Sequence, residues 1–405
     1  MIDYIQLFKD RHLFNQCTNE IELNTLLNKK KIIFYIGFDA TADALHVGSL
    51  VQLRAIKTLI KHGHQAIVLL GGGTTKVGDP SGKDTARQIL SYDNIQKNID
   101  NFKRIFEHYF RDFKENITFI NNDQWLDKLN YIELLRDVGS HVSINRMLTF
   151  ESVKERLKRE QSLSFLEFNY MVMQGYDFYE LNKRYDCCLQ MGGSDQWGNI
   201  VCGIDLARRL SGANLFGLTT PLLTTSSGQK MGKTEDGSIW LNYEEGNKDF
   251  STHPRDFWNY WRDKTENELV GKWMRLFTDL PLKEIQKYEI LEGEEVESAK
   301  EVLATKITEI VHGKDSDWDS NEIYSVSSNL ISKGIGLLSF LSTEYLDLTK
   351  SNSESRRFVR SKAIKLNKLV ITDEKYILNL SDFNKDGDLI VSFGKKKRII
   401  VRIKK

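Results

Sequence analysis

Apolar residues in the first seventy positions follow a strand pattern, then a helix pattern, then a strand pattern again. Residues 31–38 are a nearly continuous run of branched and aromatic side chains, which is typical of a buried strand. Between 50 and 60 the apolar positions recur at helical spacing, and Gly63 supplies a stop signal for that helix. Residues 65–70 form the second apolar run. This succession predicts a right-handed parallel unit.

Three later apolar runs continue the alternation of strands and helical stretches. They cover residues 117–120, 187–191 and 218–223. The pattern predicts an α/β fold whose first domain, over residues 1–247, is a Rossmann-like doubly wound parallel sheet. In such a sheet the ligand crevice lies beyond the carboxyl ends of the strands. Segments that directly follow predicted strands are therefore candidates for a site.

The second half of the sequence has a different character. Residues 248–325 carry aromatic and aliphatic side chains at helical spacing, which predicts an α-helical domain. A Ser- and Asn-rich stretch predicts a linker at 326–340, and residues 341–405 are expected to form a small α+β domain. A chain of 405 residues is long enough for two or three domains.

The composition is ordinary for a globular protein. Hydrophobic residues make up 40% of the chain and charged residues 28%, and no run approaches the roughly eighteen apolar residues that a membrane span needs. The first residues lack the features of a secretory signal, so we expect a cytoplasmic protein with no membrane contact. Four cysteines without paired spacing argue against a disulfide framework and against a structural metal site.

The net charge of +1 conceals an uneven distribution. Residues 351–405 contain fifteen Lys and Arg against six Asp and Glu, a local net charge of +9, and the remainder of the chain carries −8. Such an asymmetry favours an anionic polymer as a partner, although a solvated basic tail would have the same composition.

Two polar, glycine-containing segments are candidates for binding a polyphosphate. His46-Val47-Gly48-Ser49 lies at the start of the predicted helix, where free N–H groups and the helix dipole favour an anion. Segment 228–234 carries Lys230 and Lys233, whose compact charges suit a mobile phosphate grip. Taken singly, the first could be an ordinary turn with a hydrogen-bonded histidine and the second a solvated loop. The glycine-rich segments 71–83 and 192–198 match neither the P-loop nor the dinucleotide fingerprint.

The pair of segments has the spacing of the HIGH and KMSKS signatures, so the chain resembles the class I aminoacyl-tRNA synthetases. Residues 35–39, 79–83, 170–177 and 190–199 narrow the resemblance to the bacterial-type tyrosyl-tRNA synthetases, over nearly the whole chain. The resemblance implies a homodimeric ligase that activates L-tyrosine with ATP, accompanied by Mg²⁺, and then charges tRNA(Tyr). It further implies that residues 1–247 are catalytic and that 248–325 lie on the anticodon side.

The resemblance assigns roles to individual residues. For tyrosine binding it implies Tyr35 and Asp177 at the phenolic hydroxyl, Asp79, Tyr170 and Gln174 at the ammonium, and Gln196 near the reacting carboxylate. For ATP it implies Gly37, Asp39, Gly48, Ser49, Gly193, Asp195 and Lys233. For catalysis it implies Thr41, His46, Lys83, Arg87, Lys230, Lys233 and Thr234, which meet the phosphates. Ser49 replaces the second histidine of HIGH, and Gly232 and Thr234 replace the two serines of KMSKS.

The basic C-terminal region resembles a small RNA-binding module found in a small-subunit ribosomal protein and in pseudouridine synthases. The similarity lies in residues 353–360 and 364–367. It implies phosphate contacts by Arg356, Arg357, Arg360, Lys362 and Lys365. Recognition of this kind depends mainly on RNA shape and backbone.

Two other functions stay open at this stage. A tryptophan-specific relative would share the fold and both signatures, although Tyr35 with Asp177 suits a phenol better than an indole. A non-catalytic RNA-binding or splicing protein on a synthetase scaffold would bind RNA without activating an amino acid. For the homodimer, the apolar helical region 125–150 is where we expect the interface.

Overall fold

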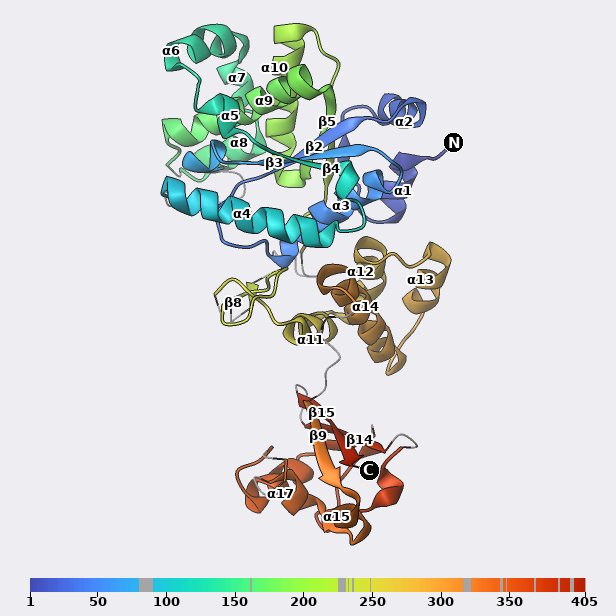
Figure 1. Cartoon of the computed structure of the whole chain (residues 1–405). Helices are drawn as coiled ribbons and strands as arrows, with labels where there is room; N and C mark the ends of the chain where they lie inside the picture. Colours follow the sequence, from blue (N-terminus) through green and yellow to red (C-terminus); the bar gives the residue numbers. More distant parts are fainter. Residues whose placement is uncertain are drawn as a thin grey trace. The chain divides into compact units, whose positions relative to one another are not determined.

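The chain folds into two compact units, Met1–Asp315 and Ser316–Lys405 (Figure 1). The computed structural model describes residues 1–79, 90–160, 162–224, 231, 233–234, 237–247, 249–314, 316, 322–342, 345–346, 348–367, 369–384, 387–393 and 397–404. Within these residues, no helix is both long enough and apolar enough to cross a membrane.

A six-stranded sheet with the order β1-β6-β5-β2-β3-β4 forms the centre of the first unit. The strands are β1 (Gln16–Cys17), β2 (Ile33–Phe38), β3 (Gln65–Leu70), β4 (Ile117–Asn121), β5 (Cys187–Gly193) and β6 (Phe216–Thr220). All neighbours are parallel except β1, which pairs antiparallel with β6. The predicted doubly wound α/β fold is confirmed; only β6 is shifted, because it begins two residues earlier than its apolar run.

Helices cover both faces of this sheet. They are α1 (Tyr4–Asp10), α2 (Glu20–Lys29), α3 (Leu50–Ile60), α4 (Tyr92–Tyr109), α5 (Asp123–Leu126), α6 (Tyr131–Glu133), α7 (Ile144–Met147), α8 (Glu151–Lys158), α9 (Phe165–Tyr185) and α10 (Trp197–Ser211). Successive β2 residues point to opposite faces. Tyr35 therefore packs edge-on against Phe178 of α9 with ring centres 5.2 Å apart, whereas Phe38 packs against Phe106 of α4 at 4.9 Å. Figure 1 shows α9 and α10 on one side of the sheet and α4 on the other.

The order of the strands places a crevice between β2 and β5. From β2 the chain proceeds to β3 and β4 on one side, and then returns to β5 and β6 on the other side. The connections on the two sides of β2 therefore diverge at its carboxyl end. A doubly wound sheet binds its ligand at such a switch point.

Four helices complete the first unit after the sheet: α11 (Pro254–Lys264), α12 (Val270–Phe277), α13 (Leu282–Glu289) and α14 (Glu295–His312). Their core is aromatic, because the Trp261 ring lies 5.5 Å from the Trp273 ring and 5.0 Å from the Phe277 ring. These helices belong to the same compact unit as the sheet.

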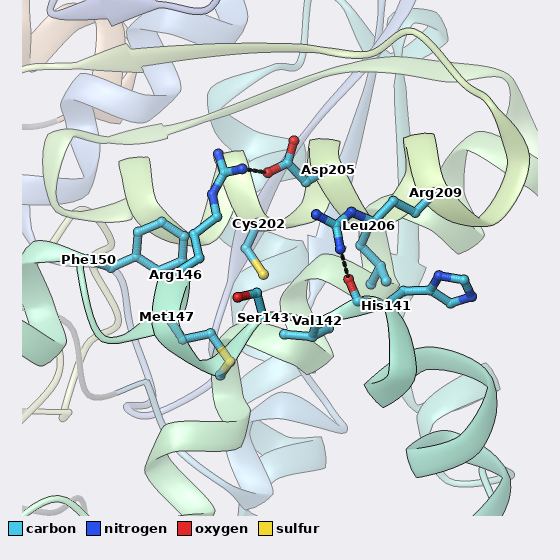
Figure 2. Close-up of a pocket in the computed structure, with 10 residues that line it drawn as sticks. All are labelled: His141, Val142, Ser143, Arg146, Met147, Phe150, Cys202, Asp205, Leu206 and Arg209. Carbon is cyan, nitrogen blue, oxygen red and sulfur yellow. Dashed lines mark hydrogen bonds and ion pairs between the residues drawn. The ribbon is translucent and has the colours of Figure 1, made fainter.

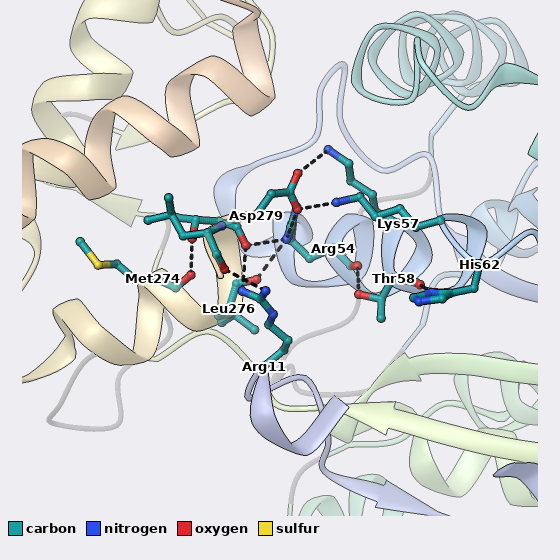
Figure 3. A network of polar contacts seen from close by, with 11 residues as sticks. Arg11, Arg54, Lys57, Thr58, His62, Met274, Leu276 and Asp279 are labelled. Atoms are coloured by element: carbon teal, nitrogen blue, oxygen red, sulfur yellow. Dashed lines mark hydrogen bonds and ion pairs between the residues drawn. The ribbon is translucent and has the colours of Figure 1, made fainter. Parts of the chain in front are cut away.

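A buried arginine joins α3 to the segment after α12 (Figure 3). The Arg54 guanidinium donates to the Thr278 carbonyl and to Asp279 Oδ1, both at 2.9 Å. Lys57 and Lys61 lie 3.3 and 2.7 Å from the same carboxylate. Although burial opposes it, the attraction of these three cations holds the pKa of Asp279 well below its usual range. Since α3 begins at the His46 turn, this network connects the candidate site with the helical part of the unit.

The second unit is a five-stranded sheet with helices packed against it. The sheet order is β12-β11-β14-β15-β9. Its strands are β9 (Glu322–Ser327), β11 (Ile364–Leu366), β12 (Leu369–Val370), β14 (Asp388–Phe393) and β15 (Lys397–Lys404); β10 (Ile335–Gly336) pairs with β13 (Ile377–Leu378). Its helices are α15 (Ser328–Ser332), α16 (Leu337–Leu341) and α17 (Asn352–Arg360).

The predicted linker at 326–340 is wrong, and so is the end of the helical region at 325. Strand β9 pairs with β15 over its whole length, and Ile331, Leu337 and Phe340 are completely buried in the core of the second unit. The Ser and Asn residues that suggested a linker are exposed positions at the end of β9 and along α15: Ser327, Ser328, Asn329 and Ser332. The second unit therefore begins near residue 316, about twenty-five residues before the predicted boundary.

We predict that Asp279→Asn lowers the free energy of unfolding at pH 7 by about 1–3 kcal/mol, because the buried Arg54 loses its anionic partner while Asp279 itself is partly exposed. The pKa of Asp279 is depressed in the folded state. The difference in the free energy of unfolding between the wild type and the variant is therefore fully present at neutral pH and decreases as pH falls below about 4. Urea unfolding at pH 7 and at pH 3 measures both effects. Glu297→Gln, which removes an exposed partner of Lys300, serves as the control. A difference in the free energy of unfolding that is equal at both pH values would contradict the prediction.

Candidate active site

A cavity of about 370 Å³ lies at the carboxyl ends of β2 and β5. Fourteen of the residues expected from the sequence line it: Tyr35, Gly37, Asp39, Thr41, His46, Gly48, Ser49, Asp79, Tyr170, Gln174, Asp177, Gly193, Asp195 and Gln196. They come from segments far apart in the chain. The parallel sheet brings them together because the segments that follow its strands emerge at one edge.

The other residues that the sequence predicts for the phosphates are not among those that line the cavity. Lys83, Arg87 and Lys230 lie outside the described residues. The backbone of Lys233 and Thr234 forms the short strand β7 (Lys233–Thr234), which pairs with β8 (Gly237–Ser238).

His46 ends the turn between β2 and α3. Its Nδ1 accepts a hydrogen bond of 2.9 Å from the Gly48 N–H, so the neutral ring carries its proton on Nε2 as a donor. A side chain at position 48 would put a Cβ 2.5 Å from the His46 ring, so glycine is required here. The Val47 N–H donates to the Ile239 carbonyl at 2.8 Å. The chain beyond the lysine segment is thereby tied to the histidine turn.

Asp177, on α9, is a completely buried carboxylate in the floor of the cavity. Trp125 Nε1 donates to one of its oxygens at 2.7 Å and Asn122 Nδ2 to the other at 2.9 Å. Burial raises the pKa of Asp177 to about 8, although the two donated hydrogen bonds oppose this shift by stabilising the ionised form. Asp177 therefore titrates near neutral pH. The neighbouring Tyr35 has a pKa raised well above its usual value, chiefly by burial, and remains a neutral phenol.

Two further carboxylates line the upper part of the cavity. The Tyr170 hydroxyl donates to Asp39 at 2.9 Å, and Gln196 Nε2 donates to Asp79 at 2.8 Å. Asn199 then fixes two amides, because its Nδ2 donates to the side-chain carbonyls of Gln174 and Gln196 at 2.9 and 3.1 Å. The orientations of these polar groups are therefore set before any ligand enters.

Three buried polar atoms on the cavity wall have no hydrogen-bond partner among the described residues. They are the Tyr35 hydroxyl and the side-chain carbonyl oxygens of Gln52 and Gln190. Leaving such atoms unsatisfied is costly, so the cavity is suited to a ligand that supplies both donors and acceptors.

Among the polar residues that line the cavity, the sequence analysis missed Gln52, Thr74, Asn122 and Gln190, and it also missed Trp125, which contacts Asp177. Asn122 and Trp125 directly follow β4, and Thr74 follows β3, so all three stand at carboxyl ends of strands. That position is a usable signal. The contact of Trp125 and Asn122 with Asp177 was not predictable, because it depends on how α9 packs over β4.

A second, much smaller hollow lies beside α7 and α10 (Figure 2). Its volume of about 20 Å³ has room for roughly one water molecule. Arg146 pairs with Asp205 at its edge, and Arg209 donates to the His141 carbonyl at 2.9 Å. This hollow is too small to be a substrate site. In the described part of the chain, no group of three or more His, Cys, Asp or Glu side chains could hold a metal ion.

A doubly wound sheet with a polar cavity at its switch point is the arrangement of a nucleotide-binding α/β enzyme. The chain matches the model of the family described as tRNA synthetases class I (W and Y) over residues 27–329. The chain belongs to this family of class I aminoacyl-tRNA synthetases.

Two similar proteins match the chain over nearly its full length. A tyrosine–tRNA ligase from Ehrlichia ruminantium (strain Welgevonden) is 47% identical over 98% of this chain and 97% of its own. One from Pelagibacter ubique (strain HTCC1062) is 45% identical over all of both chains.

Solved structures show the same fold. A C-terminally truncated mitochondrial tyrosyl-tRNA synthetase from Aspergillus nidulans is 28% identical, has a TM-score of 0.67, and matches 78% of this chain and 91% of its own. A tyrosyl-tRNA synthetase from Archaeoglobus fulgidus, solved with L-tyrosine, is 16% identical, has a TM-score of 0.58, and matches 77% of this chain and 98% of its own.

We predict that Asp177→Asn changes how stability depends on pH. The folded wild type holds the Asp177 proton up to about pH 8, whereas the unfolded chain releases it near pH 4, so wild-type stability falls as pH rises through this window. The asparagine variant lacks this fall. Between pH 5 and pH 8 the free energy of unfolding of the variant should therefore rise relative to that of the wild type, by at most about 1.4 kcal/mol per pH unit.

Urea unfolding at pH 5, 6, 7 and 8 provides the measurement. Asp137→Asn, which changes an exposed carboxylate paired with Arg136, should run parallel to the wild type. Parallel curves for Asp177→Asn as well would show that Asp177 is ionised in the folded protein throughout this range.

Proposed function

We propose that the protein is a tyrosine–tRNA ligase, which activates L-tyrosine with ATP and transfers it to tRNA(Tyr). The observation that carries the proposal is the pair of Tyr35 and Asp177 in the cavity, a buried hydroxyl and a buried carboxylate. The full-length similarity to proteins named tyrosine–tRNA ligase supports it.

The pair is suited to a phenol. A phenolic hydroxyl can donate to an oxygen of Asp177 and accept from the Tyr35 hydroxyl, whereas an indole N–H only donates. Phenylalanine would leave both protein groups unpaired, and unpaired buried polar groups are strongly unfavourable. At the other end of the substrate, Asp79, Tyr170 and Gln174 would hold the ammonium group. Tyr170 is prepared for this role, because its proton is committed to Asp39 and its lone pairs can accept.

In the first step a carboxylate oxygen of tyrosine attacks the α-phosphorus of ATP. The bond from the α-phosphorus to its bridging oxygen breaks, and pyrophosphate leaves with the electron pair. The attacking carboxylate is already ionised at neutral pH, so the protein contributes orientation and charge stabilisation and needs no general base. In the second step the terminal ribose hydroxyl of the tRNA attacks the tyrosyl carbonyl, and AMP leaves.

The nucleotide would lie along the β2 and β5 ends of the cavity. A Cβ at Gly37 would meet nothing within 4 Å, which leaves open space beside the strand for the nucleotide. Asp195 would accept from a ribose hydroxyl, with Asp39 and Gln196 near the reacting groups. Gly48, Ser49 and Gly193 would line the ATP site. Thr41 and His46 would meet the outer phosphate, since the His46 Nε2–H is a donor at a helix start.

The leaving pyrophosphate would be stabilised by cations from two segments. Lys83 and Arg87 follow Asp79, and Lys230, Lys233 and Thr234 belong to the signature segment. Mg²⁺ would be held by the ATP phosphates, whose charge it neutralises.

The second unit would bind the tRNA through its basic helix. Arg356 and Arg360, one turn apart on α17, both contact Glu374, at 3.1 and 2.5 Å, and Arg357 is exposed beside them. Two guanidinium groups that share one carboxylate retain positive charge for phosphates. Lys362 and Lys365 would extend the same surface, and binding should weaken steeply with salt.

We also propose a homodimer and cytoplasmic charging of tRNA. Large apolar side chains are exposed between α6 and the start of α9: Tyr131, Ile132, Leu135, Ile144, Leu148, Leu157, Phe165 and Leu166. An accumulation of this kind favours a protein interface. Trp125, the first residue of the region expected to form the interface, is instead buried against Asp177.

The decisive experiment is amino-acid-dependent exchange between ATP and pyrophosphate with the purified protein. Tyrosine should support exchange with a kcat/KM far above the measurable but low values for tryptophan and phenylalanine. Tyr35→Phe should reduce the preference for tyrosine over phenylalanine by roughly twofold to tenfold, the value of one neutral hydrogen bond. Exchange with tryptophan alone would favour the tryptophan-specific relative, and RNA binding without any exchange would favour a non-catalytic RNA-binding or splicing protein.

Deletion of the second unit separates the two steps of the reaction. Truncation after Lys314 should retain tyrosine-dependent exchange, because the cavity lies wholly in the first unit, and should abolish charging of tRNA(Tyr). A cut inside 322–340 would be uninformative, since it leaves part of the second core exposed. Full charging by residues 1–314 would refute the role of the basic unit.

A further inference from the structure

The glycine-rich loop after β3 has a structural role that its sequence did not reveal. The Gly73 N–H donates to Asn122 Oδ1 at 2.8 Å, which joins this loop to the end of β4. A side chain at position 71 would put a Cβ 2.3 Å from Asp39 Oδ1, so the loop also lies directly against the end of β2. The absence of side chains at 71–73 lets the backbone approach both neighbouring strands.

Thr74, the first polar side chain after these glycines, connects two carboxylates of the cavity. Its hydroxyl donates to Asp39 Oδ1 at 2.8 Å and accepts from Asn122 Nδ2 at 3.0 Å. The same Nδ2 donates its second proton to Asp177 Oδ2 at 2.9 Å. A continuous chain of hydrogen bonds therefore runs from Asp39 through Thr74 and Asn122 to Asp177.

The direction of every hydrogen bond in this chain is determined. Asn122 Oδ1 is occupied by the Gly73 N–H, so the amide cannot be flipped and both protons of Nδ2 point at Thr74 and Asp177. Since the Thr74 oxygen receives one of those protons, its own proton is directed to Asp39. Valine has the shape of threonine and could fill neither role.

We propose that the Thr74 hydroxyl is a positioning group that couples recognition of the substrate's phenol at Asp177 to the placement of Asp39 beside the reacting groups. The inference rests on the proposed function, because it takes the phenol to lie at Asp177. Loss of the hydroxyl leaves one Asn122 proton without its acceptor and removes one hydrogen-bond donor from Asp39. The side chains of Asp177 and Asp39, at the two ends of the cavity, are then held less firmly.

The test compares Thr74→Val, which keeps the shape, with Thr74→Ser, which keeps the hydroxyl. Tyrosine-dependent and phenylalanine-dependent exchange are measured for each, with kcat and KM determined separately. Thr278→Val is the matched control, since it removes a buried hydroxyl whose hydrogen bonds, within the described residues, go to the backbone of Met274 and Leu280. Thr74→Ala replaces Thr74→Val in the comparison if the valine variant does not fold.

We expect kcat/KM for tyrosine to fall by roughly tenfold or more in Thr74→Val, with a clearly smaller loss for phenylalanine, and to stay within about threefold of wild type in Thr74→Ser. Equal losses on both substrates would refute the coupling. Equal losses in Thr74→Val and Thr74→Ser would assign the effect to packing, which overturns the proposal. Wild-type protein without tyrosine-dependent exchange would instead refute the proposed function.

Discussion

The cavity depends on carboxylates that are fully or partly removed from water, and these carboxylates receive hydrogen bonds from the protein. Asp177 is completely buried and accepts from Trp125 and Asn122, while Asp39 accepts from Tyr170 and Thr74. An unsatisfied buried carboxylate would be strongly unfavourable. The donors come from the ends of β3 and β4 and from α9, so the strands and helix are held in register by the same bonds that order the site.

The same constraint explains why the site is polar yet rigid. The groups that contact the cavity are fixed by neighbours that are not themselves expected to touch a substrate, such as Asn199 behind Gln174 and Gln196. Orientation supplied in this way is what an adenylate-forming reaction requires, since its nucleophile is already ionised. The raised pKa of Asp177 follows from the same arrangement, because a carboxylate buried in the floor of the cavity is hard to ionise.

The helix α3 connects the cavity with the helical part of the first unit. The turn that leads into it contains Gly48 and Ser49, and the helix itself carries Arg54, which is bound to the Thr278 carbonyl and to Asp279. Because one end of α3 lies at the cavity and its body is bound to the segment after α12, the helix fixes the position of the cavity relative to the helical region. The second unit has its own core and its own basic helix, which is consistent with a separate contribution to tRNA binding.

The sequence by itself determined the alternation of strands and helices and the doubly wound sheet, and its resemblance to the tyrosyl-tRNA synthetases supplied fourteen of the residues that line the cavity. Hydrophobic periodicity is a local property, and segments after parallel strands converge whatever their composition. Only the tertiary structure decided that Trp125 and Asn122 meet Asp177, that Thr74 joins Asp39 to Asn122, and that residues 326–340 are a folded part of the second unit. Those contacts link residues brought together only by packing, and neither polarity nor spacing in a single sequence specifies which partner each polar group will find.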